Sequence, residues 1–322
     1  MTGEVSSTPR PAVFHHSCRA MGTRFSLVLP GLDSRAGEPL AEFAESHLRS
    51  QERLMSRFDP LSPISELNQR AADEPIPVPP ALWKILAQCH HHWQRTRGAF
   101  DITQSPLNQL WRASLQRGEM PSTESLRETR RLTGMDQLQF DDTAHTLKFA
   151  ANGMMLDLGG FGKGCALESL AKHFRQQGVA RAFFSFGESS VTVIGSHPHG
   201  PAWPVGIAHM FNSRAAVHTF NLRDASLSTS GTAPFNETGG PQNFGHIINP
   251  RDGCPIAGYR TMSVAAPSAI DAEVLSTALL VTPETERAEI LTAYPDASAL
   301  EIVYEPHNAF APRIQWRYET AL

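Results

Sequence analysis

The sequence predicts an α+β protein with a largely antiparallel sheet packed with helices. Segments with helical periodicity dominate as far as about residue 132, whereas short alternating segments dominate after residue 135. Too few helices separate these later segments for a regular alternation of parallel strands and helices. With 322 residues and 41% hydrophobic content, the chain can bury one large core or two modest ones.

The first half of the chain is predicted to contain one strand and three clear helices. A strand is expected over residues 24–29, where apolar residues alternate with polar or smaller ones. Helices are expected over residues 39–58, over 80–97 with a cap at Gly98, and from 122 or 123 to 134. We therefore expect a flexible polar arm over residues 1–19 and a single domain over 20–322. Its helical part would span about 36–134 and its sheet-rich part about 135–322.

From residue 137 to 157 the period changes to that of strands. The runs LQF, TLKFA and MMLDL follow one another, and Asn152-Gly153 predicts a two-residue hairpin between the last two. A helix over 164–177 is expected next. Strands follow at 182–186, 191–194, 204–207, 219–222 and 261–265.

Composition limits the classes of binding partner and the cellular compartment that we expect. A formal net charge of -4 and the lack of a long Lys/Arg run argue against nucleic acid or an anionic membrane as the main partner. The four cysteines are scattered without a C-x-x-C pair, which favours free thiols in a reducing compartment over a disulfide framework or a zinc site. The N-terminal residues contain no apolar run typical of an export signal, and no later run approaches membrane-spanning length. The expectation is a cytoplasmic protein with no stable membrane association.

The run LDLGGFGKG at residues 156–164 is the most informative segment, because a strand-like stretch ends in four glycines around one lysine and then becomes helical. Gly159, Gly160, Gly162 and Gly164 would let the backbone approach a ligand, while Lys163 and free helical N–H groups would attract phosphate. The run matches neither a Walker loop nor G-x-G-x-x-G. The alternative is a glycine-lined turn needed only for tight packing.

Three other clusters could carry chemistry. The runs LSTSG at 227–231 and FGHIINPRDG at 244–253 are rich in turn formers and predict a ligand-facing loop. There His246 could act as a general acid or base and Arg251 could clamp a phosphate, although simple surface solvation is the alternative for both. In GAFDIT at 98–103, Asp101 and Thr103 are interpreted as caps of the helix that follows.

The third cluster is AEVLSTALLV at 272–281. If this run is helical, Glu273 and Thr277 are four residues apart and project from one face. A carboxylate and a hydroxyl suit Mg²⁺, which completes its shell with water and substrate phosphate. The alternative is a threonine bonded back to a helix carbonyl beside a solvated glutamate.

Taken together, these motifs resemble the ApbE family. AMGT at 20–23, LMSRFDPLSPISELN at 54–68, GAFDIT, DLGGFGKG, the LSTSG and HIINPRDG pair, and AEVLSTAL occur in the family's order and cover about residues 20–282. The resemblance implies an ApbE-like architecture related to the T-fold. It also implies a FAD:protein FMN transferase, which cleaves FAD with Mg²⁺ assistance, releases AMP and attaches FMN to a Ser or Thr hydroxyl of a target flavoprotein.

The resemblance also assigns residues. The matching positions for the flavin nucleotide lie in the Met-Gly-Thr segment, the glycine run and the histidine segment: Met21, Gly22, Thr23, Asp157, Gly159, Gly160, Lys163, Ser230, Gly231, His246 and Arg251. The family's Mg²⁺ ligands fall on a main-chain carbonyl at Gly162 and on Glu273 and Thr277. Lys163, His246 and Glu273 are the predicted catalytic residues, with His246 as the candidate base that removes the proton of the acceptor hydroxyl.

Several positions depart from the family's pattern. The usual metal aspartate is Glu273 here, Asn249 and Asp252 change the histidine motif, and Glu188 adds a charge near the expected flavin position. Two other functions therefore stay open: an FAD pyrophosphatase that gives FMN and AMP, and a non-catalytic flavin-binding or carrier protein.

Overall fold

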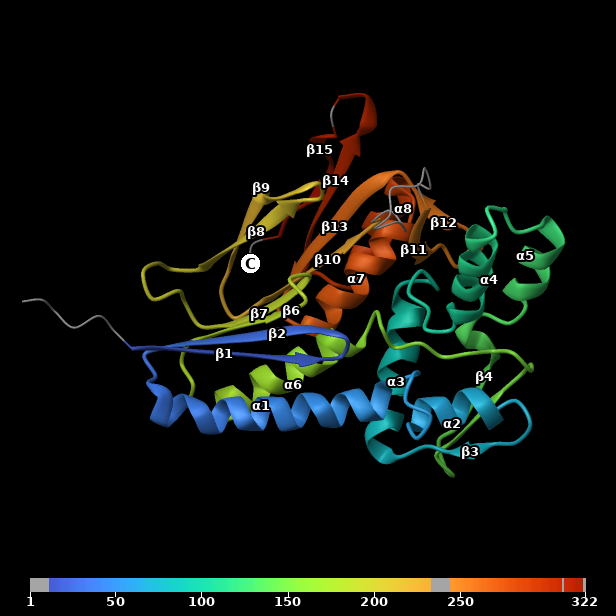
Figure 1. Cartoon of the computed structure of the whole chain (residues 1–322), viewed down its shortest axis with the longest axis horizontal. Coiled ribbons are helices and arrows are strands. Elements are labelled where there is room, and N and C mark those ends of the chain that lie inside the picture. Colours follow the sequence, from blue (N-terminus) through green and yellow to red (C-terminus); the bar gives the residue numbers. More distant parts are fainter. Residues whose placement is uncertain (1–11, 233–243, 309, 321–322) are drawn as a thin grey trace, which may run out of the picture.

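The computed structural model describes residues 12–232, 244–308 and 310–320, with the backbone alone described at 244–246. Eight strands form one sheet in which every neighbouring pair is antiparallel. In spatial order they are β1 (Val13–Ala20), β2 (Thr23–Pro30), β6 (Ala182–Phe186), β7 (Ser190–Ile194), β10 (Ser226–Gly231), β13 (Tyr259–Ala266), β14 (Ser298–Glu305) and β15 (Ala311–Tyr318). The predicted α+β class is confirmed (Figure 1).

Three small sheets and eight α-helices complete the described fold. The small sheets pair β3 (Ile76–Pro77), β5 (Thr146–Phe149) and β4 (Leu138–Asp141); β8 (Trp203–His209) and β9 (Asn212–Leu222); and β11 (Phe244–Ile248) and β12 (Pro255–Ala257). The helices are α1 (Ser34–Met55), α2 (Pro63–Arg70), α3 (Pro80–Arg95), α4 (Ser105–Gln116), α5 (Thr123–Arg130), α6 (Gly162–Gln176), α7 (Ala269–Val281) and α8 (Glu284–Leu291).

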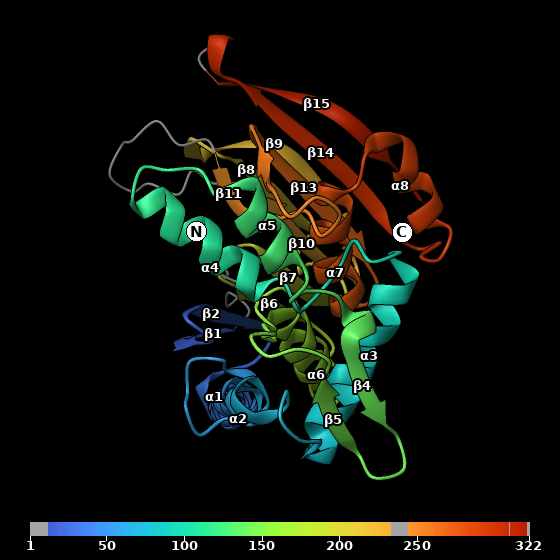
Figure 2. The same ribbon diagram turned by 90° about the vertical axis from the view of Figure 1, so that its right-hand side faces the viewer.

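The main sheet is covered on both faces. On one face α6 contacts β6 and β7, α7 contacts β10 and β13, and α1 packs against α6 and β1 (Figure 1). On the other face the β8–β9 hairpin supplies Trp203, Val205 and Ile207 to a cluster with apolar residues of β7, β10 and β14. In Figure 2, α4 lies beside α5 and β11, above the pair formed by α1 and α2. The central strand β7 is therefore buried along its whole length.

Two helices approach each other closely at one glycine. A Cβ placed on Gly164 in α6 would lie 2.7 Å from the Ala269 carbonyl oxygen and 2.8 Å from the Glu273 Cβ in α7. Real Cβ atoms do not show such contacts, so only glycine permits this α6–α7 distance. The glycine therefore fixes the position of α7 against α6.

The first strand corrects the prediction for the N-terminus. Residues 13–20 do not belong to a loose arm, because they pair along their whole length with β2, from Val13 opposite Pro30 to Ala20 opposite Thr23. Only one face of this edge strand is covered, so its sequence VFHHSCRA contains few apolar residues. Helix α1 also begins earlier than predicted, at Ser34, because the Asp33 side chain accepts a hydrogen bond from the Ala36 N–H and caps it.

The predicted hairpin at Asn152-Gly153 is wrong. A turn is present there, but the residues that follow it form no strand, and β5 pairs instead with β4 and β3. The backbone of Leu156 is held by a side chain: the Asn68 amide donates to the Leu156 carbonyl at 3.0 Å, and the Leu156 N–H donates to Asn68 Oδ1 at 2.7 Å. The Asn68 amide therefore replaces a strand partner at the entrance to the glycine run.

The run LSTSG is a strand rather than a loop, and the first half of FGHIINPRDG is also a strand, β11. The run LSTSG lies in β10, between β7 and β13 near the middle of the sheet, and Ser226, Leu227 and Ser228 are buried. The predicted strands and helices elsewhere are present with shifted ends. The elements that were not individually predicted are α2, α8, β3, β11, β12, β14 and β15.

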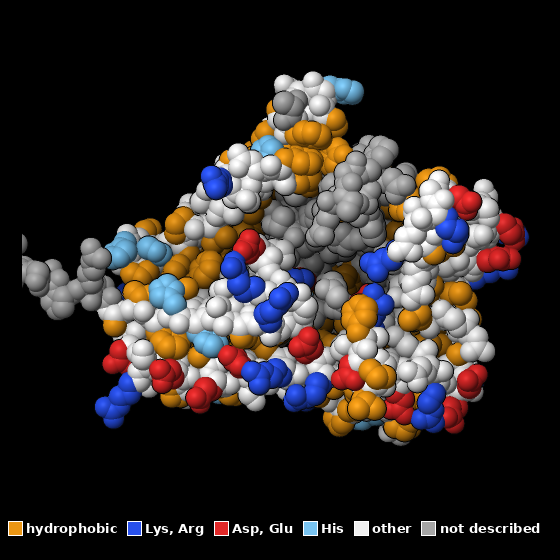
Figure 3. Space-filling view, viewed as in Figure 1, with side chains coloured by type: hydrophobic (Ala, Val, Ile, Leu, Met, Phe, Trp, Pro, Cys, Tyr) orange, Lys and Arg blue, Asp and Glu red, His pale blue; other side chains and the backbone are white. Residues whose placement is uncertain are grey.

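The surface has mixed charge. On the face shown in Figure 3, acidic and basic side chains are interspersed along the region of α1. Among the described residues, none of the helices combines the length and the apolar character that crossing a membrane requires.

Candidate active site

Two cavities adjoin each other at the glycine run. The first has a volume of about 510 Å³, the second about 440 Å³, and both are lined by Asp157, Gly159, Lys163 and Ser189. The first is also lined by residues 99–102, by β10 and by α7; the second by the β1–β2 turn and by the end of α1. A ligand longer than either cavity could therefore extend from one to the other across the glycine run.

The β1–β2 turn places Met21, Gly22 and Thr23 at the second cavity. Met21 and Gly22 have φ angles of 49° and 75°, which are those of a two-residue type I′ hairpin turn. Beside this turn, a Cβ on Gly187 would lie 2.8 Å from Thr23 Oγ1, so a glycine is needed there as well. The Met-Gly-Thr segment, which the resemblance assigns to the flavin nucleotide, therefore lines the second cavity.

The glycine run is held by a carboxylate at its start. Asp157 Oδ1 accepts a hydrogen bond from the Gly159 N–H at 2.9 Å, and Asp157 Oδ2 forms an ion pair with Arg57 Nε at 2.8 Å. The Gly160 carbonyl accepts no backbone hydrogen bond within the described ranges, and this residue lines the first cavity. Gly162 is the first residue of α6 and lines the second cavity.

Glu273 is the most buried acidic group at the first cavity, with 4% of its surface exposed. Its Oε1 accepts from Lys163 Nζ, and its Oε2 accepts from Ser190 Oγ at 2.6 Å and from Ser228 Oγ at 3.2 Å. Burying a carboxylate at this depth requires such partners, because an unpaired charge loses its hydration. The solvated glutamate of the alternative interpretation is therefore excluded.

Thr277 lies one turn further along α7 and also lines the first cavity. Ser230 Oγ lies 3.0 Å from Thr277 Oγ1 and 2.8 Å from Ser276 Oγ. Together with Glu273, these hydroxyls form a set of hard oxygen donors from α7 and β10. Such donors fit a magnesium ion.

Three predicted residues are placed differently from the rest. Within the described ranges, neither cavity is lined by Arg251, which instead forms an ion pair with Glu286 at 2.6 Å. Glu188, the extra charge, pairs with Arg24, and 74% of its side chain is exposed. His246 belongs to β11, and its side chain lies outside the described part of the chain. Gly231 and Ser230, by contrast, both line the first cavity.

The GAFDIT segment does not cap α4 as predicted. Asp101 Oδ1 accepts from the N–H and the hydroxyl of Thr103, at 2.7 and 2.6 Å, while the cap residue of α4, Gln104, makes no side-chain cap bond. Burial raises the pKa of Asp101, although the bonds from Thr103 oppose that shift. Asp101 lines the first cavity and is a polar group that the capping interpretation missed.

Sequence reasoning also missed one aromatic side chain and two hydroxyls. Phe58 lines the second cavity with 78% of its surface exposed, and its position after α1 inside a recognised motif was the available signal. Ser228 lies in the LSTSG run but received no role of its own, and Ser190 carries no signal, since only the fold brings both to Glu273.

Comparison with known proteins identifies what the chain is similar to. The model of the ApbE family matches residues 21–300. The FAD:protein FMN transferase of Escherichia coli (strain K12) is 27% identical over 296 residues, which cover 88% of this chain and 84% of the relative. The FAD:protein FMN transferase of Chlamydia muridarum is 29% identical over 245 residues, 74% of each chain.

Solved structures agree in fold. The flavinyl transferase ApbE of Pseudomonas stutzeri, in its apo form, superposes with a TM-score of 0.77 at 26% identity and covers 91% of this chain and 92% of its own. The flavin transferase ApbE of Vibrio cholerae gives a TM-score of 0.76 at 24% identity, over 95% of this chain and 96% of its own. These matches extend over both halves of the described fold.

Proposed function

Since the chain belongs to the ApbE family, we propose that it transfers FMN from FAD to a Ser or Thr hydroxyl of a target flavoprotein, with Mg²⁺ assistance and release of AMP. One observation carries the proposal. A buried carboxylate, Glu273, meets a lysine and several hydroxyls at the point where two cavities adjoin across a glycine run. This is an arrangement suited to a pyrophosphate between two larger groups.

The glycine run is proposed to bind the pyrophosphate. Gly159 and Gly160 bring the backbone to the cavity wall without side chains, and Lys163 adds a positive charge in the first turn of α6. The N-terminal end of a helix favours anions because its first N–H groups lack partners. The two halves of the dinucleotide would then occupy the two cavities, with Met21, Gly22 and Thr23 at one end and Ser230 and Gly231 at the other.

The oxygen donors of α7 are proposed to hold the magnesium ion. Glu273 and Thr277 fit this ion, and the main-chain carbonyl that completes the set is better assigned to Gly160 than to Gly162. The Gly160 carbonyl faces no backbone donor within the described residues and belongs to the same cavity as Glu273, whereas Gly162 begins the helix and lines the other cavity. When bound, Mg²⁺ would supply positive charge that neutralises the pyrophosphate oxygens.

Lys163 and Glu273 have linked roles in this proposal. Their ion pair means that a cation approaching Glu273 Oε1 competes with the lysine ammonium for that oxygen. A phosphate at the glycine run would give Lys163 another acidic partner and release the carboxylate. FAD and the metal ion are therefore expected to bind cooperatively.

Glu273 replaces the family's aspartate with a side chain one methylene longer. The two serines that bond its Oε2 anchor the carboxylate from β7 and β10, which limits the freedom that the extra methylene adds. A glutamate can serve here because these hydroxyls position it. His246 is still proposed as the general base, because of its position in the HIINPRDG motif.

We also propose that the protein is located in the cytoplasm. The four free cysteines agree with a reducing compartment such as the cytoplasm.

The test incubates the protein with FAD, Mg²⁺ and candidate acceptor proteins, and reads flavin fluorescence on a denaturing gel together with AMP release. Transfer predicts AMP and labelled acceptor in equal amounts, and both fall in Glu273→Ala and Thr277→Ala. AMP without labelled protein would instead identify an FAD pyrophosphatase. FAD binding that is unaffected by Mg²⁺, with no AMP over long incubation, would identify a carrier.

A further inference from the structure

A second group of metal-binding side chains lies outside the active site, between β1 and α1. His16 and Cys18 are two residues apart on β1, so they project from the same face of the strand. That face also carries Phe14 and Ala20, which are buried toward α1. Glu45 of α1 faces them, and one ligand atom from each of the three side chains lies within 4.8 Å of the others.

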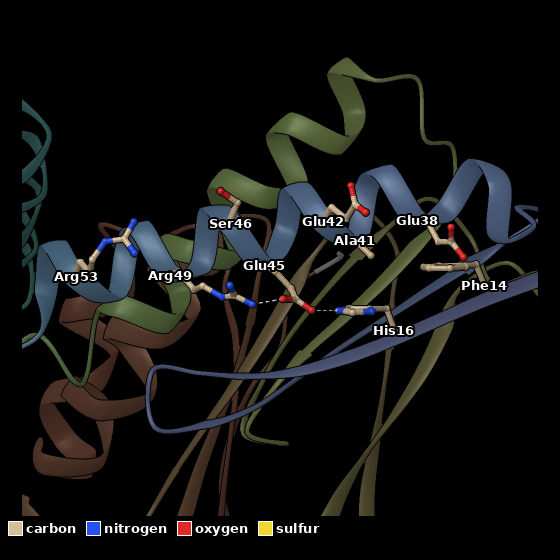
Figure 4. Close-up of a pocket in the computed structure, with 9 residues that line it drawn as sticks. All are labelled: Phe14, His16, Glu38, Ala41, Glu42, Glu45, Ser46, Arg49 and Arg53. Atoms are coloured by element: carbon tan, nitrogen blue, oxygen red, sulfur yellow. Dashed lines mark hydrogen bonds and ion pairs between the residues drawn. The ribbon is translucent and has the colours of Figure 1, made fainter.

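The His16 ring lacks the hydrogen bond that its surroundings would suggest. Its Nε2 lies 2.9 Å from Glu45 Oε1 (Figure 4), yet the two atoms do not have hydrogen-bond geometry. The same nitrogen is buried and has no other hydrogen-bond partner among the described residues. A buried nitrogen in this state is costly unless a further group binds it.

We propose that His16, Cys18 and Glu45 bind a zinc ion, with water as the fourth ligand. The lack of a C-x-x-C pair argued against a cysteine-rich zinc site, but this site needs only one cysteine. Imidazole nitrogen, thiolate sulfur and carboxylate oxygen are the three kinds of protein ligand that zinc accepts in tetrahedral sites. A thiolate disfavours Mg²⁺ and Ca²⁺, which prefer oxygen, so this site is chemically distinct from the oxygen donors around Glu273.

The surroundings leave room for the ion and for its water. His16 and Glu45 line a cavity of about 520 Å³ that opens along α1 (Figure 4). Arg49 bonds Glu45 Oε2 and leaves Oε1 directed at His16. Arg49 and Arg53 add positive charge to this cavity, but Glu38 and Glu42 line it as well and offset that charge.

Binding would release a proton. A cysteine binds zinc as a thiolate, so the Cys18 thiol must lose its proton when the ion binds. The bound ion would join an edge strand to the helix that covers it. The turn that carries Met21 to the second cavity begins three residues after Cys18.

The experiment uses metal-free full-length protein prepared by chelation. Titration with Zn²⁺ against a chromophoric chelator is expected to give one tight site per chain and proton release in weakly buffered solution. Co²⁺ in place of Zn²⁺ is expected to give thiolate-to-cobalt absorption and the intense visible bands of a tetrahedral ion.

Matched variants separate this site from incidental binding. Cys18→Ser and His16→Gln are expected to lose the cobalt–thiolate band and at least 10-fold in zinc affinity. His15→Gln, on the opposite exposed face of β1, and Cys254→Ser are expected to keep both. Glu45→Gln is expected to weaken zinc binding, whereas Glu42→Gln in the same cavity is not.

Zinc should also raise the melting temperature of the wild-type chain but not that of Cys18→Ser. Comparing each protein with and without zinc separates loss of the metal site from poor folding of the variant. The Glu273→Gln variant should keep the cobalt–thiolate band, so the outcome does not depend on the proposed transferase activity. Absence of that band in the wild type, or its equal loss in His15→Gln and His16→Gln, would overturn the proposal.

Discussion

Replacing Gly164 with alanine tests whether this glycine serves the packing of α6 against α7, whereas Gly160 serves ligand binding. The added methyl group would lie 2.7 Å from the Ala269 carbonyl oxygen and 2.8 Å from the Glu273 Cβ. Ordinary contact begins at 3.4 Å, so α6 and α7 must separate by about 0.7 Å. Since neither atom belongs to a flexible side-chain end, the backbones themselves must move.

The substitution has two opposing effects on the free energy of unfolding. Overpacking of this kind costs about 1–3 kcal/mol, while alanine in place of glycine in a helix returns up to about 1 kcal/mol. We expect the Gly164→Ala variant to lose about 1–2 kcal/mol of stability, and the melting temperature of this 322-residue chain to fall by about 1.5–3 °C. The displacement also moves Glu273, so Mg²⁺-dependent AMP release should fall as well.

Gly160→Ala is the matched control. A Cβ there would meet only Phe100, at 4.0 Å, and both residues line the first cavity. The fold should therefore keep its melting temperature, while FAD binding weakens by about 10-fold because the methyl group occupies space meant for the ligand. Thermal unfolding and calorimetric FAD titration of both variants give the answer. Unchanged stability in Gly164→Ala, or a fall in stability in Gly160→Ala with normal FAD binding, would refute the reasoning.

Three further predictions concern charge. Glu273→Gln keeps the shape of the side chain but removes its charge, so AMP release at saturating FAD should fall about 100-fold; an unchanged Mg²⁺ dependence would contradict the metal assignment. Arg287→Ala removes the 2.8 Å partner of the buried Glu301 and leaves it only Arg260, at 3.3 Å, so it should cost about 3 kcal/mol in urea unfolding. Arg287→Met with Glu301→Leu should regain part of this loss, since the Leu279 and Thr282 carbonyls still lack the donor that Arg287 supplied. Burial lowers the pKa of His92 to about 4, so the unfolded chain binds this proton first and stability falls as pH drops from about 6.5 to 4. The His92→Gln variant lacks this effect, so between pH 7 and 5 its free energy of unfolding should fall by about 2 kcal/mol less than that of the wild type, as measured by urea unfolding at each pH. Burial raises the pKa of Asp271 to about 6, which opposes the loss in both proteins.

The sequence predicted best where local periodicity and chemistry coincide. Helical spacing alone placed Glu273 and Thr277 on one face of α7, and both line the first cavity. For the glycine run, the binding and the packing interpretations each apply to different residues: Gly164 serves packing, while Gly159 and Gly160 line the cavity. The family resemblance was needed to connect these segments, which are more than 100 residues apart.

The failures have a common cause in contacts between distant segments. The serines of β10 look like turn residues, yet Ser228 is buried because it donates to a carboxylate on α7. The edge strand β1 contains few apolar residues because solvent covers one of its faces, although its alternate positions from Phe14 to Ala20 do follow a period of two. The Asn152-Gly153 hairpin failed because the Asn68 amide had already satisfied the backbone that a partner strand would need.

Helix α7 has a consequence for how the protein can diversify. Eleven of its residues are buried, so almost any substitution along it disturbs the core as well as the ligands it carries. The cavity rims, by contrast, come from the exposed turn after α1, where Phe58 lies, and from the β11–β12 connection with Pro250. Selection for a new acceptor protein, in nature or in a library, should therefore accumulate changes on these rims while α7 is inherited unaltered.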